Sequence, residues 1–182
     1  MQEHIKVPQD RIGAIIGVEG KVKETLEKKS GAHIDVDSES GTVLIEADEK
    51  ADPFKALKAS EAIKAIARGF SPEKALKLLD VDDLLLDMID LSKISDAPSD
   101  LARIKGRIIG KGGKTREIME SMTGAKISVY GKTISIIGDP EQTMTIRTAI
   151  DMLIDGAPHG AVYGNLERRR RELKQSQFET IE

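Results

Sequence analysis

The chain has 182 residues, with 28 Lys and Arg against 31 Asp and Glu, a formal net charge of −3, 3% aromatic residues and no cysteine. The missing cysteines exclude disulfides, thiolate metal sites and a cysteine nucleophile, and the three scattered histidines offer no spacing for a histidine metal site. No apolar run reaches the roughly 18–20 residues that span a bilayer, and the first residues lack the apolar segment of a signal peptide. We expect a cytoplasmic, monomeric protein that uses no metal, cofactor or membrane contact.

In the first half, alternating apolar residues predict a strand over His4–Pro8, and an apolar helical turn follows and stops at Gly17. A second helix begins at Lys21 and ends at Gly31, a residue type suited to a left-handed C-cap. Two strands and a longer helix complete the set, because Asp52-Pro53 supplies an N-cap and a first-turn proline. The strands are Ile34–Asp37 and Val43–Ala47, the helix ends near Gly69, and one more helix runs from Ser71 to about Leu79.

The second half predicts the same order of strand, helix, helix, strand, strand and helix. A strand over Leu86–Leu91 precedes a helix that stops at Gly110, and the next helix runs from Lys114 to Gly124. The remaining elements are strands Lys126–Tyr130 and Thr133–Ile137, a helix opened by Asp139-Pro140 that ends near Gly156, and a basic helical segment over Leu166–Lys174.

Recurring motifs indicate that the two halves are a duplication. Ile-Ile-Gly at 15–17 recurs at 108–110, an offset of 93, whereas Asp-Pro at 52–53 recurs at 139–140, an offset of 87. The six-residue change falls between Val36 and Asp52, where we expect the longer turn Asp37–Gly41. The sequence therefore predicts an α+β protein with two related domains, residues 1–79 and 80–166, and a basic tail over 167–182.

The charges are distributed unevenly along the chain. Residues 1–97 hold 14 basic and 20 acidic side chains, whereas residues 98–182 hold 14 basic and 11 acidic ones. Six basic residues and no acidic one lie between Arg103 and Arg116, on both sides of Gly110-Lys111-Gly112-Gly113. Glycines let a sugar-phosphate chain approach the backbone, and the next helix directs free N–H groups and its positive dipole end toward a ligand. This turn, flanked by Lys114, therefore predicts a site for a backbone phosphate.

Two other nucleotide-binding motifs do not fit this segment. A Walker A loop requires glycine at the place of Ile108 and a strand where a helix is predicted. The dinucleotide fingerprint requires a glycine at the place of Thr115. Because no His, Ser and Cys constellation, metal set or nucleotide loop is present either, we predict a binding protein and not an enzyme.

The element order and the G-x-x-G turn are those of a KH domain, which clamps about four single-stranded nucleotides. Arg103–Arg116, then Thr123–Ala125 and Ile127–Thr133, resembles the second KH repeat of archaeal two-KH proteins related to the eukaryotic pre-ribosomal factor called Partner of Nob. The resemblance extends over nearly the whole chain, through Gly160–Tyr163 and the basic tail. It implies two tandem type I KH domains (βααββα each) with short extra helices and a basic C-terminal helix. It also implies binding to small-subunit ribosomal RNA during ribosome assembly, together with a protein partner.

The resemblance also assigns roles to residues of the second repeat. The turn Gly110, Lys111, Gly112 and Gly113 would hold the RNA backbone, with Arg107, Lys114 and Arg116 as further cations. An aliphatic floor under the bases would come from Ile108, Ile109, Ile127 and Val129, and the strand after Ala125 would offer backbone groups to base edges beside Lys126. The low aromatic content suits such a groove, although helical spacing leaves open that Ile108 and Ile109 are core residues.

The first repeat departs from this pattern. Its turn, Gly17-Val18-Glu19-Gly20, keeps both outer glycines but carries a carboxylate that would repel phosphate unless Lys21 or Lys23 offsets it. We predict either a weakened RNA clamp or a protein-facing turn. The carboxylates of residues 80–100 are interpreted as a solvated acidic face. Arg168, Arg169, Arg170 and Arg171 are either a solvated helix end or a further contact to RNA or protein.

The sequence favours a ribosome-assembly factor that clamps ribosomal RNA. Two alternatives stay open: a general KH module that binds mRNA or other RNA in translation or decay, and a scaffold for protein interactions.

Overall fold

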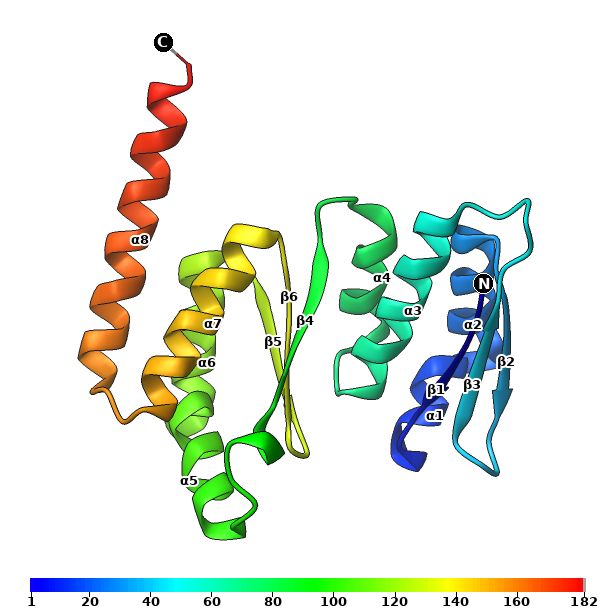
Figure 1. The fold of residues 1–182 in the computed structure, drawn as a ribbon, viewed down its shortest axis with the longest axis horizontal. Helices are drawn as coiled ribbons and strands as arrows, with labels where there is room; N and C mark the ends of the chain where they lie inside the picture. The colour runs from blue at the N-terminus through cyan, green and yellow to red at the C-terminus, as the bar shows by residue number, and fades with distance from the viewer. Residues whose placement is uncertain (182) are drawn as a thin grey trace. The chain divides into compact units, whose positions relative to one another are not determined.

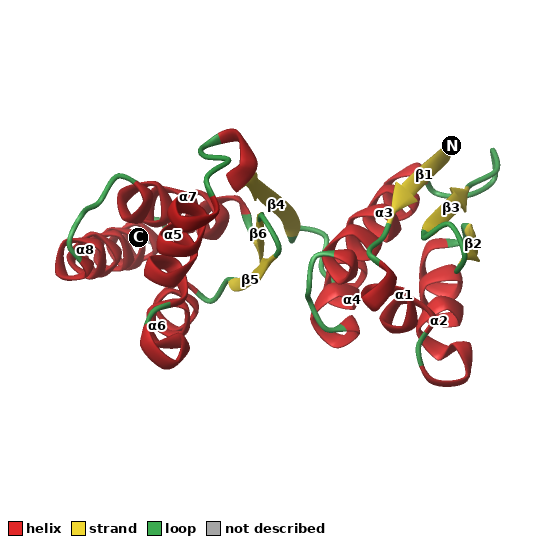
Figure 2. Cartoon of the chain, turned by 90° about the horizontal axis from the view of Figure 1, so that it is seen from below, coloured by secondary structure: helices red, strands yellow, loops and turns green. Residues whose placement is uncertain are grey.

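The computed structural model describes residues 1–181 and divides into two compact units, Met1–Leu86 and Asp87–Glu182 (Figure 1). In each unit a three-stranded sheet carries its helices on one face, as both Figure 1 and Figure 2 show. This arrangement is the predicted α+β fold with the order βααββα in each half, followed by further helices.

In the first unit the strand order is β1-β3-β2, and both pairs are antiparallel. The third strand therefore lies in the middle of the sheet and β2 forms one edge. The elements are β1 (Gln2–Lys6), α1 (Gln9–Ile16), the short 3-10 helix η1 (Val18–Gly20), α2 (Lys21–Ser30), β2 (His33–Asp37), β3 (Thr42–Glu46), α3 (Pro53–Ala67) and α4 (Pro72–Asp80).

The second unit repeats this topology with the strand order β4-β6-β5, so β5 forms an edge. Its last helix, α8, continues without a break into the predicted basic tail. The elements are β4 (Leu85–Asp90), η2 (Leu91–Lys93), α5 (Pro98–Ile109), η3 (Lys111–Gly113), α6 (Lys114–Thr123), β5 (Lys126–Tyr130), β6 (Thr133–Gly138), α7 (Pro140–Ile154) and α8 (His159–Glu179).

Two details differ from the sequence-based expectations. Strand β1 begins and ends two residues before the expected His4–Pro8, because its register with β3 runs from Gln2 opposite Glu46 to Lys6 opposite Thr42. The longer first repeat gains only two of its six extra residues in the β2–β3 turn. The other four lie between β3 and α3, so the expected single insertion at Asp37–Gly41 was only partly right.

The helix boundaries follow the residues that cap them. The Asp52 carboxylate accepts a hydrogen bond from the Phe54 N–H at 2.9 Å, and Asp139 and Gln142 form a reciprocal capping box at the start of α7. Gly31 and Gly124 end α2 and α6 in the left-handed conformation, as their positions predict.

Each unit has an aliphatic core between its sheet and its helices. In the second unit, Ile104 and Ile108 of α5 pack with Ile134 and Ile136 of β6, and α8 adds Val162 and Leu166. Beyond Leu166 the helix contributes no buried residue within the described chain. None of the helices described over residues 1–181 is long and apolar enough to cross a membrane.

Candidate nucleic-acid interface

The turn between α5 and α6 brings two helix ends and two lysines together. Gly110 ends α5, η3 forms a single short turn in which the Gly113 N–H donates to the Gly110 carbonyl at 3.1 Å, and Lys114 begins α6. The first N–H groups of a helix have no partner within that helix and carry its positive dipole end. The turn thus presents backbone donors and cations at one exposed corner of the second unit.

Gly110 and Gly112 of this turn are glycines for different physical reasons. A Cβ at Gly110 would lie 2.2 Å from the Thr115 Oγ1, so no larger residue fits there. At Gly112, by contrast, a Cβ would meet nothing within 4 Å, and the φ of +62° alone favours glycine. The open space beside Gly112 leaves the backbone accessible to a ligand.

The cations at the turn are available for a ligand. Lys111 and Lys114 are exposed, and neither forms an ion pair within residues 1–181. The Nε of Arg116, in the first turn of α6, lies 3.8 Å from the Glu120 carboxylate, and this exposed contact holds the guanidinium only weakly. A phosphate at this corner would meet at least two free positive charges.

Beside the turn, α6 and the edge strand β5 form the two sides of the predicted groove. The Glu120 carboxylate reaches across it and accepts a hydrogen bond from the Ile127 N–H at 3.1 Å. The Ile127 N–H of β5 is therefore already bonded within the protein and is not free to meet a base edge. No local sequence pattern predicts this contact. Lys126, at the start of β5, is exposed and can contact a ligand. Ala125 is fully buried, so its side chain cannot contact a ligand in this structure.

The predicted aliphatic floor divides into two pairs. Ile108 and Ile127 are 0% and 3% exposed and belong to the core, so their side chains present almost no surface to a base in this structure. Their positions lie on the faces of α5 and β5 that pack against the core. Ile109 and Val129 are partly exposed and can offer apolar surface to a ligand.

Arg107 is held by the fold. Its Nε donates to the Leu153 carbonyl at 2.9 Å and one Nη donates to the Ala157 carbonyl, both at the end of α7. Arg11 of the first unit makes the same two contacts, to Ile66 and Phe70 at the end of α3. The Ile66 and Leu153 carbonyls also accept the Gly69 and Gly156 N–H groups, each at 3.2 Å, so the arginine at either position adds a charge-assisted bond at a helix end.

The turn of the first unit has nearly the same backbone as its counterpart. Gly17 has φ +77° and ψ 174°, against +75° and 173° at Gly110, and Glu19 at φ 56° takes the place of Gly112. Glu19 is the single non-glycine residue with positive φ in the described chain, a conformation that costs roughly 1–3 kcal/mol. Lys21 approaches the Glu19 carboxylate to only 3.8 Å and both side chains are largely exposed, so the negative charge is poorly offset.

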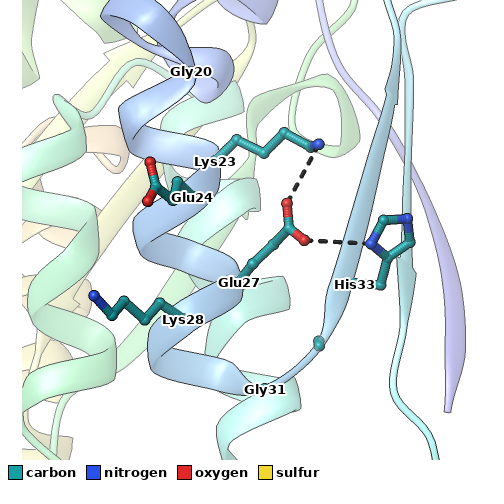
Figure 3. A pocket seen from close by; sticks show the side chains of 8 residues that line it. Gly20, Lys23, Glu24, Glu27, Lys28, Gly31 and His33 are labelled. Atoms are coloured by element: carbon teal, nitrogen blue, oxygen red, sulfur yellow. Dashed lines mark ion pairs between the residues drawn. The ribbon is translucent and has the colours of Figure 1, made fainter.

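The groove beside this first turn has mixed charge. Figure 3 shows Glu27 of α2 pointing toward β2, where its carboxylate lies 3.3 Å from the Lys23 Nζ and 3.3 Å from the His33 Nδ1. The concavity has a volume of about 610 Å³, and Glu24 and Lys28 also line it. Lys23 therefore pairs with Glu27 and not with Glu19, so of the two lysines that could offset Glu19 only Lys21 lies near it.

Glu27 and Glu120 occupy the same position in the two repeats, 93 residues apart. Each carboxylate lies between the second helix of its unit and the edge strand. The repeat offset was the signal that could have singled out this pair, because no nearby motif marks either residue.

The arginines of α8 lie beyond the core. Arg169 and Arg170 make exposed pairs with Glu172 and Glu167, at 3.5 and 3.3 Å, whereas Arg168 and Arg171 form no ion pair within the described residues. Over the described residues, two of the four guanidinium groups are thus not engaged in an ion pair. Within residues 1–181, no group of three or more His, Asp or Glu side chains is arranged to hold a metal ion.

These features define a protein with two tandem KH domains, of which the second carries the basic glycine turn. Residues 85–171 match the family described as the eukaryotic type KH domain (KH-domain type I), and residues 2–64 match the KH domain family. The predicted type I assignment is thereby confirmed for the second domain. The two matches lie in different units of the structure.

Full-length comparisons identify the family more closely. The chain is 41% identical to the KH domain-containing protein MJ0443 of Methanocaldococcus jannaschii over 97% of this chain and 78% of that protein. It is 30% identical to the pre-rRNA-processing protein PNO1 of Candida albicans over 94% of this chain and 63% of that protein, so it spans under two thirds of the eukaryotic relative. The chain belongs to the archaeal two-KH-domain family related to PNO1.

A solved structure gives the same result in three dimensions. The Dim2p chain in the a/eIF2alpha–aDim2p–rRNA complex from Pyrococcus horikoshii OT3 superposes with a TM-score of 0.87 and 45% identity, covering 94% of this chain and 95% of that one.

Proposed function

We propose that this protein binds single-stranded small-subunit ribosomal RNA through its second KH domain and acts as an assembly factor during maturation of that RNA. The observation that carries the proposal is the exposed turn Gly110–Gly113, with Lys111 in the turn and Lys114 at the start of α6, neither of them in an ion pair within residues 1–181. The family supports the choice of RNA, since a relative is a pre-rRNA-processing protein and another forms a complex with rRNA.

The turn acts on the phosphate backbone and not on the base sequence. Helix N-terminal N–H groups, Lys111 and Lys114 attract one or two phosphates, and the lack of a side chain at Gly112 lets the sugar-phosphate chain lie against the backbone. Bases then extend over the partly exposed Ile109 and Val129 toward the edge strand β5. Arg116 and Lys126 add charge along this path.

The first domain has a different role in this account. Its groove combines carboxylates with lysines, and its turn carries Glu19, so phosphate binding there is weak and a protein surface is the better ligand. An initiation-factor subunit accompanies the archaeal relative in its rRNA complex, which supports a protein partner from ribosome assembly or translation. We propose that the protein acts in the cytoplasm, without catalysis.

Substitution at the two turns tests the proposal. Replacing Lys111 and Gly112 together by Asp should abolish binding to single-stranded RNA, because two carboxylates then face the phosphates. Asp tolerates positive φ better than most residues and the space beside Gly112 is open, so the fold should survive. Val18→Asp in the first turn is the matched control and should change affinity far less. Binding is measured by fluorescence anisotropy, and folding by circular dichroism.

The salt dependence of the same titrations adds a second readout. The logarithm of wild-type affinity should fall steeply with the logarithm of salt concentration, since each neutralised phosphate releases counterions. Unchanged affinity in the folded double variant, or affinity that does not respond to salt, would contradict the proposed clamp.

A further inference from the structure

A second concavity lies on another side of the basic turn. It has a volume of about 440 Å³ and is lined by α5, the turn and the start of α8. None of its lining residues comes from β5, so it is distinct from the groove between α6 and the edge strand. We call it the α8 cleft.

The α8 cleft is basic. Arg103, Arg107, Lys111 and Lys114 line it, and no Asp or Glu does among the described residues. Arg103 forms an ion pair with Asp100, whose Oδ1 lies 2.8 Å from an Nη of the arginine. Both side chains are exposed, so this pair is weak. The first unit's groove, by contrast, has Glu24 and Glu27 in its lining. The charge of the α8 cleft therefore suits a phosphate.

One wall of the cleft is aromatic in a chain with few aromatic residues. The His159 and Tyr163 rings, both on α8, have centroids 6.1 Å apart and planes inclined by 58°. The His159 Nε2 lies 3.0 Å from the Arg107 carbonyl, and the Tyr163 hydroxyl lies 3.1 Å from the Thr115 Oγ1. These bonds attach the wall to α5 and to the start of α6, so it is preorganised.

The floor of the cleft is open at Gly106. A glycine inside a helix is destabilising relative to alanine, yet a Cβ at Gly106 would meet nothing within 4 Å. No neighbouring atom of the protein therefore requires glycine there. Its effect is to let a flat group come close to the backbone of α5 in the same cleft as His159 and Tyr163.

We infer that the α8 cleft binds one more nucleotide of the RNA strand, adjoining those in the groove. Its base lies against His159 and Tyr163, and its phosphate is shared by Lys111 and Lys114. Stacking of a base on an aromatic side chain is favourable for every base, so the site needs no particular sequence. This inference rests on the proposed function, and it extends the length of RNA that the second domain contacts.

Gly106→Leu tests the inference by filling the cleft while leaving the turn and the groove unchanged. Gly13→Leu is the matched control, because Gly13 occupies the same position in α1 and is equally open. Homopolymeric A, C and U RNAs of four and eight nucleotides serve as probes. For the homopolymer that wild-type protein binds best, Gly106→Leu should weaken binding of the eight-nucleotide RNA five- to tenfold. It should leave the four-nucleotide RNA within twofold, and Gly13→Leu should alter neither.

The outcomes separate this inference from the proposed function. Unchanged affinity of Gly106→Leu for the longer RNA would overturn the cleft site while leaving the groove intact. Equal losses for both lengths would also overturn it, since the variant would then act on the groove. Absence of RNA binding by the wild type would contradict both proposals. As a second readout, eight-nucleotide RNA carrying 5-bromouridine should photo-crosslink to the peptide that contains His159 and Tyr163, and Gly106→Leu should suppress that crosslink.

Discussion

Arg11 and Arg107 make equivalent interactions from positions that are not equivalent in the repeat. Their acceptors, Ile66 and Phe70 in one unit and Leu153 and Ala157 in the other, are related by the offset of 87 residues. The arginines are not related by the offset of 93, because Ala14 is the counterpart of Arg107. Each arginine reaches the same carbonyls from a different turn of the first helix. The fold therefore depends on the interaction and not on a fixed position.

Replacement of Arg107 by Met should destabilise the second unit by about 2 kcal/mol, because two carbonyls lose charge-assisted donors. Arg107→Lys keeps the charge without the planar fork and should destabilise it almost as much. Both tyrosines lie in this unit, so tyrosine fluorescence during urea unfolding reports on it alone. If Arg107→Lys were as stable as the wild type, the two carbonyl contacts would contribute nothing to stability.

Glu3 connects β1 to α3. Burial raises the pKa of its carboxyl, but hydrogen bonds from Lys64 and Ser60 outweigh burial and hold that pKa below its ordinary value of 4.5. A lowered pKa in the folded state contributes stability above pH 4.5, and this contribution is lost as the pH falls through the folded value.

Glu3→Gln should therefore lower the unfolding free energy of the first unit at pH 7 by roughly 1 kcal/mol. The difference from the wild type should shrink below about pH 4. Amide hydrogen exchange on β1 and α3, measured at pH 7 and at pH 3 in the wild type and the variant, provides the test. A difference that stays constant between pH 7 and pH 3 would show that ionisation of Glu3 does not matter.

At the scale of elements, the two turns show how one backbone carries two different surfaces. Grafting Val18→Lys with Glu19→Gly gives the first domain the sequence of the second turn. Because Glu19 has φ of 56°, glycine there should stabilise the first unit by roughly 1 kcal/mol. The graft should also increase RNA affinity in the background of Lys111→Asp with Gly112→Asp. Thermal denaturation and anisotropy titrations measure the two effects, and a destabilised graft would refute the strain at Glu19.

The basic end of α8 is a separable element. Since Leu166 is its last buried residue, deletion of residues 168–182 should change the unfolding free energy of the second unit by less than about 1 kcal/mol. If Arg168 and Arg171 contact phosphates, the deletion should also reduce the slope of log affinity against log salt by about 1–2. An unaltered slope would assign this helix end to solvent or to protein.

At the scale of the whole molecule, the sequence was sufficient for the order of elements in both repeats. Caps at Asp52 and Asp139 and glycines at the helix ends are local signals, and the structure follows them. The burial of Ile108 and Ile127 was not predictable, because one helical or strand period suits both a core face and a ligand face. Contacts such as Glu120 to Ile127 and Tyr163 to Thr115 join distant elements, and no local pattern encodes them.

The net charge of −3 likewise concealed the distribution that matters for function. The second unit concentrates its cations around one turn and one helix, whereas the first unit's groove pairs lysines with glutamates. Two domains of one fold thus present different surfaces, one basic and one of mixed charge.

The central claim is that the second KH domain binds small-subunit ribosomal RNA in the cell. Ultraviolet crosslinking followed by sequencing of the bound RNA tests it most directly, with the Lys111→Asp, Gly112→Asp double variant as the control. We predict enrichment of one segment of small-subunit rRNA and loss of that enrichment in the double variant. Reads spread broadly over mRNAs, or an rRNA signal that the double variant retains, would contradict the account.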